Sequence, residues 1–108
     1  MNKIKSISLI FPLYKDKSTV KLMISKSLAT LKRIKKKFEI IIIDDGCPQS
    51  SGKIALKISK KIKNIKVIFH KKNLGYGAAL KTGLKNSKYE WIFMIDGYGM
   101  KETDTIEQ

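Results

Sequence analysis

The sequence has little of several residue types, and each shortage excludes a class of protein. Cys47 is the only cysteine in 108 residues; one thiol cannot build a disulfide framework, and a reducing compartment is the simplest setting. No apolar run approaches the roughly 20 residues of a membrane-spanning helix. The first five residues also lack the apolar segment of a secretory signal peptide. We therefore expect a cytoplasmic protein.

Acidic residues are scarce as well. Nine aspartates and glutamates stand against 23 lysines and arginines, which gives a net charge of +14 at pH 7. The lysines are spread over every predicted helix, without the basic stripe and interleaved aromatic residues typical of nucleic-acid-binding proteins, so we expect no nucleic-acid partner. Scattered lysines suffice for weak adsorption to an anionic membrane surface, which leaves a peripheral position at the inner membrane face as an alternative.

The length of the chain predicts one domain, residues 1–108, with a single core. No linker, internal repeat or low-complexity segment divides it. The chain is small for a complete two-substrate enzyme.

The most informative stretch is Phe38 to Gly46, with the sequence FEIIIIDDG. Four consecutive β-branched isoleucines are typical of a strand covered on both faces, as in the middle of a parallel sheet. Asp44 and Asp45 follow at the carboxyl end of that strand, where open α/β sheets place their ligand crevice. We therefore look for function at this end of the sheet.

Strands and helices alternate along the rest of the chain. Further strands are predicted over Ile7 to Phe11, Val67 to His70 and Trp91 to Ile95. Helices are predicted from the N-cap Ser18 to about Lys36, over the repeat of Ile54, Ile58 and Ile62, from Ala78 to Leu84, and beginning again at Lys101. Pro12 is expected to end the first strand, because proline cannot donate to a ladder.

This alternation with short connections predicts right-handed crossovers and a parallel sheet. The predicted fold class is α/β, a three-layer sandwich with a mainly parallel central sheet of the Rossmann-like type. The carboxyl ends of the strands then line one edge. Polar and glycine residues gather at that edge: Tyr14 and Asp16, Asp44 and Asp45, residues 70–77, and residues 96–99.

Familiar phosphate-binding signatures do not account for that edge. The P-loop pattern GxxxxGK[ST] does not occur, and no GxGxxG fingerprint follows the first strand. A receiver domain of the phosphorelay type also combines an acidic pair with a later aspartate, but its acidic pair follows the first strand. Here a whole strand-helix unit precedes Asp44, so that alternative rests on fold-level analogy alone.

Four motifs, taken in order, resemble one family. They are ISLIFPLY at residues 7–14, IIIIDDG at 40–46, NLGYGAALKTGL at 73–84 and WIFMIDGYG at 91–99. Together they resemble the nucleotide-sugar-binding half of a family 2 glycosyltransferase of the GT-A fold, most like the polyprenyl-phosphate and dolichyl-phosphate sugar synthases. The resemblance covers nearly the whole chain but only the first half of such an enzyme, so it implies a fragment without the acceptor half.

The resemblance implies roles for residues after the first two strands. Beyond Pro12, Tyr14 takes the position of an aromatic residue that lies against the nucleotide base, and Asp16 stands where the family more often has glutamate. Asp45 matches the aspartate that accepts a hydrogen bond from the base, with Asp44 supporting the turn or the ribose. Taken alone, an acidic pair at a strand end is more often a turn or a cap, and Tyr14 is as readily a rim residue.

The loop from Asn73 to Gly77 precedes the third helix. Its backbone N–H groups and the helix dipole suit a diphosphate, and Gly75 and Gly77 permit close approach. Ordinary helix-entry glycine chemistry explains the same residues without a ligand. The resemblance adds Gly46 to the nucleotide-sugar-binding residues, whereas His70 is a lone histidine to which we assign no catalytic role.

The fourth motif departs from the family pattern. Family members present D-x-D at this strand end, often followed by glutamine, because a divalent ion bridging the diphosphate oxygens needs hard oxygen ligands. Here Asp96 is followed by Tyr98 and Met100 in those two places. The resemblance thus implies Mg²⁺ or Mn²⁺ bound weakly by Asp96, with the phosphates of the substrate supplying further ligands.

Three functions fit these observations. The first is a domain that binds a UDP- or GDP-sugar for transfer to an acceptor such as a polyprenyl phosphate, with a second chain as one source of the acceptor half. The second is a non-catalytic pseudo-glycosyltransferase, a binding or regulatory module, which Tyr98 and Met100 favour. The third is a basic α/β interaction domain whose acidic edge is incidental. Metal-dependent nucleotide binding separates the first from the second, and absence of nucleotide binding leaves the third.

Overall fold

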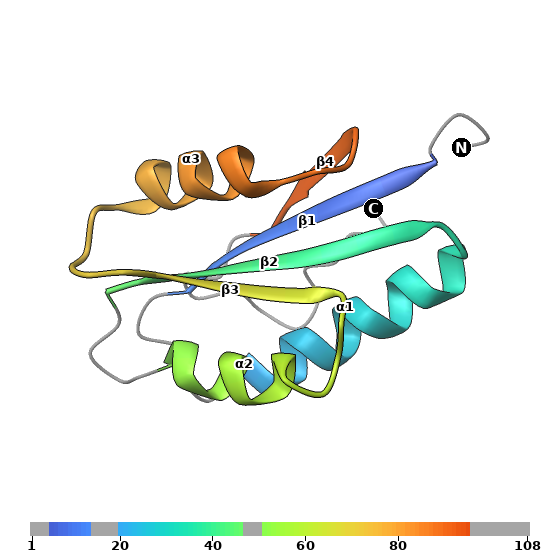
Figure 1. Cartoon of the computed structure of the whole chain (residues 1–108), viewed down its shortest axis with the longest axis horizontal. Helices are drawn as coiled ribbons and strands as arrows, with labels where there is room; N and C mark the ends of the chain where they lie inside the picture. Colours follow the sequence, from blue (N-terminus) through green and yellow to red (C-terminus); the bar gives the residue numbers. More distant parts are fainter. Residues whose placement is uncertain (1–4, 14–19, 47–50, 96–108) are drawn as a thin grey trace.

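A computed structural model describes residues 5–13, 20–46 and 51–95, in which strands and helices alternate (Figure 1). The strands are β1 (Ser6–Leu13), β2 (Lys37–Asp45), β3 (Ile65–His70) and β4 (Trp91–Met94). The helices are α1 (Val20–Ile34), α2 (Ser51–Ser59) and α3 (Tyr76–Asn86). The predicted N-cap Ser18 and the helix predicted from Lys101 lie outside the described residues.

The strands form one sheet in the order β3-β2-β1-β4, and every neighbouring pair is parallel. Helices α1 and α2 cover one face of this sheet, and α3 covers the other (Figure 1). The three-layer α/β architecture predicted from the alternation of elements is therefore confirmed.

The isoleucine run of β2 supplies the middle of both core layers. Ile40 and Ile42 pack in the cluster under α1 and α2, while Ile41 and Ile43 pack in the cluster under α3. All four side chains are 0% exposed, and each contributes about 1.5–3 kcal/mol of hydrophobic free energy. The period of two in a strand thus explains why four apolar residues in a row are needed here.

Helix α1 presents one apolar side to the sheet. Val20, Met23, Ile24 and Leu31 recur at spacings of three, four and seven, and all are buried. The helix ends at Ile34, two residues before the predicted Lys36. It ends there because Lys35 adopts a left-handed backbone with φ of 62°, which stops the helical ladder and redirects the chain into β2.

Pro12 does not end β1 as predicted. The strand continues to Leu13, and Pro12 lies opposite Ile43 of β2. In a parallel strand, the main-chain N–H and C=O groups of residues two apart point toward the same neighbouring strand. The Ile10 carbonyl accepts from the Ile95 N–H on the β4 side of β1, and Pro12 is two residues after Ile10. Pro12 therefore directs its missing N–H toward the β4 side, beyond Met94, the last residue of β4. No bond of the β1–β2 ladder is lost.

Helix α3 lies unusually close to β1. Gly83 packs on Ile10, and a Cβ at position 83 would overlap the Ile10 side chain. This close approach fixes the direction of α3, whose first residue, Tyr76, follows β3 by a short loop. The N-terminus of α3 consequently lies at the carboxyl edge of the sheet.

Within the described part of the chain, no helix combines the length and the apolar character needed to cross a bilayer.

Candidate functional site

Three strands end together at the carboxyl edge. Leu13 of β1 lies opposite Asp44 of β2, and Asp45 lies opposite His70 of β3. Adjacent side chains of a strand point to opposite faces. Asp44 consequently projects toward the α2 layer and Asp45 toward the α3 layer. The two carboxylates of the predicted pair therefore contact different elements.

Asp45 is the centre of a buried hydrogen-bond network. Its Oδ1 accepts from the Leu74 N–H (2.9 Å) and lies 2.8 Å from Nδ1 of His70. Its Oδ2 accepts from the Gly75 N–H (2.9 Å) and from Nδ2 of Asn73 (3.0 Å). The residue is 0% exposed. Both oxygens thus have at least two partners each, and the carboxylate holds the loop 73–75 against the end of β2.

Sequence reasoning missed the part that His70 takes in this network. Besides Asp45, its ring contacts Oγ1 of Thr82 in α3 through Nε2, at 2.7 Å. The side chain is only 9% exposed. The contact depends on the register of β2 against β3, which the sequence does not display; the strand-end position of His70 was the only available signal.

Gly46 allows the loop to approach the strand. Its φ of 68° is in the left-handed region, and a Cβ at this position would overlap the backbone of Lys72 and Asn73. Only glycine fits both conditions. The DDG motif therefore works as one unit, in which Asp45 binds the loop and Gly46 makes room for it.

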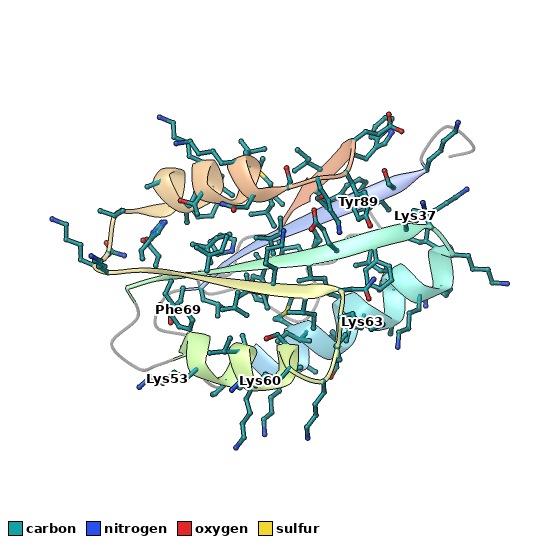
Figure 2. The ribbon with its side chains drawn as sticks, in the orientation of Figure 1. Lys37, Lys53, Lys60, Lys63, Phe69 and Tyr89 are labelled. Atoms are coloured by element: carbon teal, nitrogen blue, oxygen red, sulfur yellow. The ribbon has the colours of Figure 1, made fainter. Side chains whose placement is uncertain are left out.

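Asp44 is bound to α2. Its Oδ2 accepts from the N–H of Gly52 (2.8 Å), at the N-terminus of that helix, where a carboxylate is favourable. The Asp44 residue is 4% exposed. The ring of Phe69 lies beside this pair, between β3 and α2 (Figure 2), and is 45% exposed. An aromatic ring that the sequence analysis did not single out thus borders this edge.

The N-terminus of α3 differs from the prediction. Gly77 lies in the first turn of the helix, whereas the sequence predicted it in the preceding loop. The reason is that Gly75, with φ of 100°, is the N-cap, so helical geometry begins at Tyr76. Gly75 has no side chain to accept the first-turn N–H groups, which have no intrahelical acceptor, and no acidic residue occupies that turn.

Positive charge lies next to the same loop. Lys71 and Lys72 are exposed and directly precede Asn73. The carboxylates of Asp44 and Asp45 are buried and engaged, and the N–H groups of Leu74 and Gly75 are bound to Asp45, so the exposed part of the loop presents the lysine charges beside the start of α3. Such a surface suits a polyanion, such as a phosphate chain.

The family of the chain follows from its sequence as a whole. Residues 8–97 match the sequence model of the family described as Glycosyl transferase family 2. That span contains the acidic pair, the loop and α3. The chain belongs to glycosyl transferase family 2.

Several relatives are similar to this family 2 chain. The human protein named dolichyl-phosphate beta-glucosyltransferase is 29% identical over 96% of the chain and 34% of its own length. The undecaprenyl-phosphate 4-deoxy-4-formamido-L-arabinose transferase of Photorhabdus laumondii is 26% identical over 87% and 29%. An uncharacterized glycosyltransferase of Rickettsia conorii is 38% identical over 94% and 16%. The chain thus spans about a third or less of the length of these relatives.

Part of the predicted family 2 site lies beyond the structural description. Tyr14, Asp16, Asp96 and Tyr98 are outside the described residues. The structure brings together Asp45, Gly46, Asn73 and Gly75, places Gly77 in the adjoining helix, and separates Asp44 toward α2. Pro12 stays in β1, one residue before its end. Among the described residues, no three histidine, cysteine or acidic side chains gather in a way that could hold a metal ion.

A second polar cluster lies at the opposite, amino-terminal edge. Glu39 Oε2 accepts from the Ser8 hydroxyl (2.6 Å) and from the Lys88 N–H (2.8 Å), while Lys66 Nζ lies 3.5 Å from Oε1. Burial alone raises the pKa of the Glu39 carboxyl, but the Ser8 and Lys88 hydrogen bonds and the charge of Lys66 outweigh it. They hold the pKa below the ordinary value of 4.5. The cluster joins strands and is remote from the carboxyl edge.

Proposed function

We propose that this family 2 chain binds the nucleoside diphosphate part of a sugar donor at the carboxyl edge, for transfer of the sugar to a polyprenyl phosphate. The observation that carries the proposal is the loop 73–75, which Asp45 and Gly46 hold directly before the N-terminus of α3. The names of the human and Photorhabdus relatives, which refer to dolichyl phosphate and undecaprenyl phosphate, support the acceptor class.

The diphosphate would lie against the start of α3. The first-turn N–H groups point out of the helix at its positive end, and the glycine N-cap adds no side-chain oxygen that would compete with an anion there. A Cβ at position 77 would meet no atom of the described residues within 4 Å. Lys71 and Lys72 add positive charge beside the loop.

The base would lie nearer to β1 and β2. Tyr14 and Asp16, next along the chain from β1, are the proposed contacts from the resemblance, and the exposed ring of Phe69 beside Asp44 offers another aromatic face. A base contact by Asp45 is part of the proposal, but it requires exchange of one of its four hydrogen bonds, because both oxygens are engaged.

The chemistry proposed is a direct displacement. A phosphate oxygen of the acceptor attacks the anomeric carbon, the bond from that carbon to the diphosphate oxygen breaks, and the nucleoside diphosphate leaves with the electron pair. Backbone donors at the start of α3, with the charges of Lys71 and Lys72, would stabilise the charge that develops on the leaving group. A divalent ion, Mg²⁺ or Mn²⁺, would add to this stabilisation when bound; Asp96 is its proposed protein ligand, and Tyr98 is no equivalent of a second carboxylate.

The remaining parts of the activity are proposals for the whole protein. Because the chain spans about a third of its relatives, the acceptor site is assigned to sequence beyond these 108 residues or to a second chain. A peripheral position at an anionic membrane surface is proposed from the excess of lysines, with a net charge of +14. Figure 2 shows two of them, Lys53 and Lys60, projecting from the α2 side away from the sheet.

A second function is favoured by one sequence feature. Tyr98 and Met100 replace two residues that the family uses around the metal. A chain that binds nucleotide without metal and without transfer would act as a binding or regulatory module.

Calorimetric titration of the 108-residue protein with UDP and with GDP, each with and without Mn²⁺, tests these functions. We expect binding that prefers one base, because the base contacts are specific, and that tightens with Mn²⁺. Tyr98→Asp should increase the effect of Mn²⁺ by restoring a carboxylate ligand. Binding that ignores Mn²⁺ in both proteins would favour the non-catalytic module. A folded protein that binds neither nucleotide would refute the proposed function.

A further inference from the structure

His70 connects two elements that the proposed site depends on. It lies at the end of β3, with Nδ1 on Asp45 of β2 and Nε2 on Thr82 of α3. Thr82 lies two turns into the helix whose first residues form the proposed anion site. A continuous chain of hydrogen bonds therefore runs from Thr82 in α3, through His70 and Asp45, to the loop that precedes α3.

The donor and acceptor properties of these groups decide where the hydrogens of this hydrogen-bond chain lie. The Asp45 carboxylate only accepts, so Nδ1 of His70 carries a hydrogen and donates to it. Thr82 Oγ1 lies 2.7 Å from Nε2 and 3.1 Å from the Ala78 carbonyl. In one arrangement the Thr82 hydroxyl donates to the Ala78 carbonyl, and Nε2 of His70 then donates to Oγ1 of Thr82. In the other arrangement the Thr82 hydroxyl donates to Nε2, and its hydrogen bond to Ala78 is absent. In either arrangement both ring nitrogens are bound, and the ring cannot turn without breaking a bond.

The contact between His70 and Asp45 matters because the same carboxylate oxygen, Oδ1, also binds the loop. Oδ1 of Asp45 accepts from His70 and from the Leu74 N–H. Without the imidazole, a carboxylate that is 0% exposed would lose one of its hydrogen-bond donors. An under-satisfied buried charge draws in water or rotates toward another donor, and rotation of Asp45 would release Leu74 and Gly75.

We propose that His70 is a positioning residue that fixes the loop 73–75, through Asp45, in the conformation that binds the diphosphate. The proposal rests on the proposed function and adds a residue that acts on the ligand without contacting it. The loop is held in advance, so the nucleotide does not have to order it on binding.

Matched variants separate the two ends of the ring. His70→Asn places an amide donor near the position of Nδ1 and lacks the link to Thr82, whereas His70→Ala lacks both contacts. Thr82→Val removes only the hydroxyl. Ser8→Ala is the control, because it removes a buried hydrogen bond at the amino-terminal edge without touching the loop.

The first readout is affinity for the preferred nucleoside diphosphate and for the same nucleoside without phosphates. We expect His70→Ala to weaken diphosphate binding about tenfold, a loss of ~1.4 kcal/mol, and to weaken nucleoside binding by a smaller factor, because only the proposed base contact of Asp45 links the nucleoside to this network. His70→Asn should retain most of the diphosphate affinity, and Thr82→Val should fall between the two. An equal loss for both ligands, or a loss in Ser8→Ala as large as in His70→Ala, would reduce His70 to a general structural contact.

The second readout needs no ligand. Amide hydrogen exchange of Leu74 and Gly75 should accelerate in His70→Ala and stay slow in Ser8→Ala. Unchanged exchange in His70→Ala would overturn the inference even if nucleotide binds. If the wild-type protein binds no nucleotide while exchange responds to His70, the proposed function and the positioning role fail together, and only the coupling of His70 to the loop stands.

Discussion

Gly46 shows how much a single residue decides at the carboxyl edge. Its backbone is left-handed, with φ of 68°, and a Cβ would overlap the main chain of Lys72 and Asn73. Main chain cannot move aside as a side chain can. The approach of the loop to β2, and with it the bonds from Leu74 and Gly75 to Asp45, depends on the absence of that one carbon atom.

Replacement of this glycine should therefore be costly. We expect Gly46→Ala to lower the free energy of unfolding by about 3 kcal/mol, from the left-handed strain and the overlap together, as measured by urea denaturation. Nucleotide affinity should fall with it, because the loop is displaced.

Gly77→Ala is the matched comparison for Gly46→Ala. A Cβ at position 77 meets no atom within 4 Å, and the residue lies in α3. Alanine there should raise the free energy of unfolding by about 0.5–1 kcal/mol, since glycine weakens a helix. Equal stability of the two variants would show that Gly46 is not required for close approach.

For single residues, the sequence predicts which edge of the sheet they lie at better than it predicts their hydrogen-bond partners. The DDG motif and the loop glycines indicated that these residues meet at one edge of the sheet, because strand ends and turn residues follow local rules. The partner of Asp45 could not be predicted, because the pairing of Asp45 with His70 depends on the register between β2 and β3, and a shift of one residue would turn His70 to the other face.

Among the elements, α1 ends in an unusual way. Lys35 takes the left-handed conformation, with φ of 62°, that glycine normally supplies at a helix end, and its N–H donates to the Lys32 carbonyl (3.2 Å). A side chain in this conformation is strained. The end of α1 thus stores a small amount of unfavourable energy.

Lys35→Gly should release that strain. We expect the free energy of unfolding to rise by about 1 kcal/mol, seen as a shift of the thermal midpoint by about 4 °C or more. Lys35→Ala controls for the lost charge, because it keeps the Cβ. If Lys35→Ala stabilises the protein as much as Lys35→Gly does, charge and not backbone strain explains the gain.

The elements themselves were largely predictable. Strand β2 contains an uninterrupted run of four apolar β-branched residues, and α1 carries its apolar residues at helical spacing, so each pattern indicates one structure. The boundaries were less predictable. Pro12 stays in β1 because its missing N–H points away from the β1–β2 ladder, and Gly77 joins α3 because Gly75 caps the helix. Both facts depend on neighbours that the local sequence does not reveal.

On the scale of the molecule, most of the described carboxylates are buried, whereas none of the described lysines is. Glu39, Asp44 and Asp45 are 4% exposed or less, so Glu90 is the one exposed carboxylate among the described residues. The lysines of the described ranges are exposed or partly exposed. Over this part of the chain an anion therefore meets a mainly positive surface, while the buried carboxylates hold elements together.

The buried carboxylate of Glu39 makes stability depend on pH. Its folded pKa is below 4.5, so the unfolded state binds more protons near that pH, and its contribution is present above pH 4.5 and lost as the pH falls through the folded value. We expect Glu39→Gln to be about 1.5–3 kcal/mol less stable than wild type at pH 7. The difference should shrink between pH 4.5 and pH 3 in urea titrations.

A difference between the two proteins that stays constant down to pH 3 would contradict this account of Glu39. Lys66→Met is a useful companion variant, because it removes the ion pair at Oε1 and keeps the Ser8 and Lys88 hydrogen bonds. It should lower stability less than Glu39→Gln does.

The strand order has a consequence for synthesis on the ribosome. β1 pairs with β2 from Ser6 opposite Lys37, but its other neighbour, β4, pairs from Ile7 opposite Trp91. At about 5–20 residues per second, the interval between those two partners lasts roughly 3–11 s. During that time an apolar strand that later lies inside the sheet has an open edge. Nascent chains would therefore be most prone to association with one another, or to chaperone capture, just before Trp91 emerges.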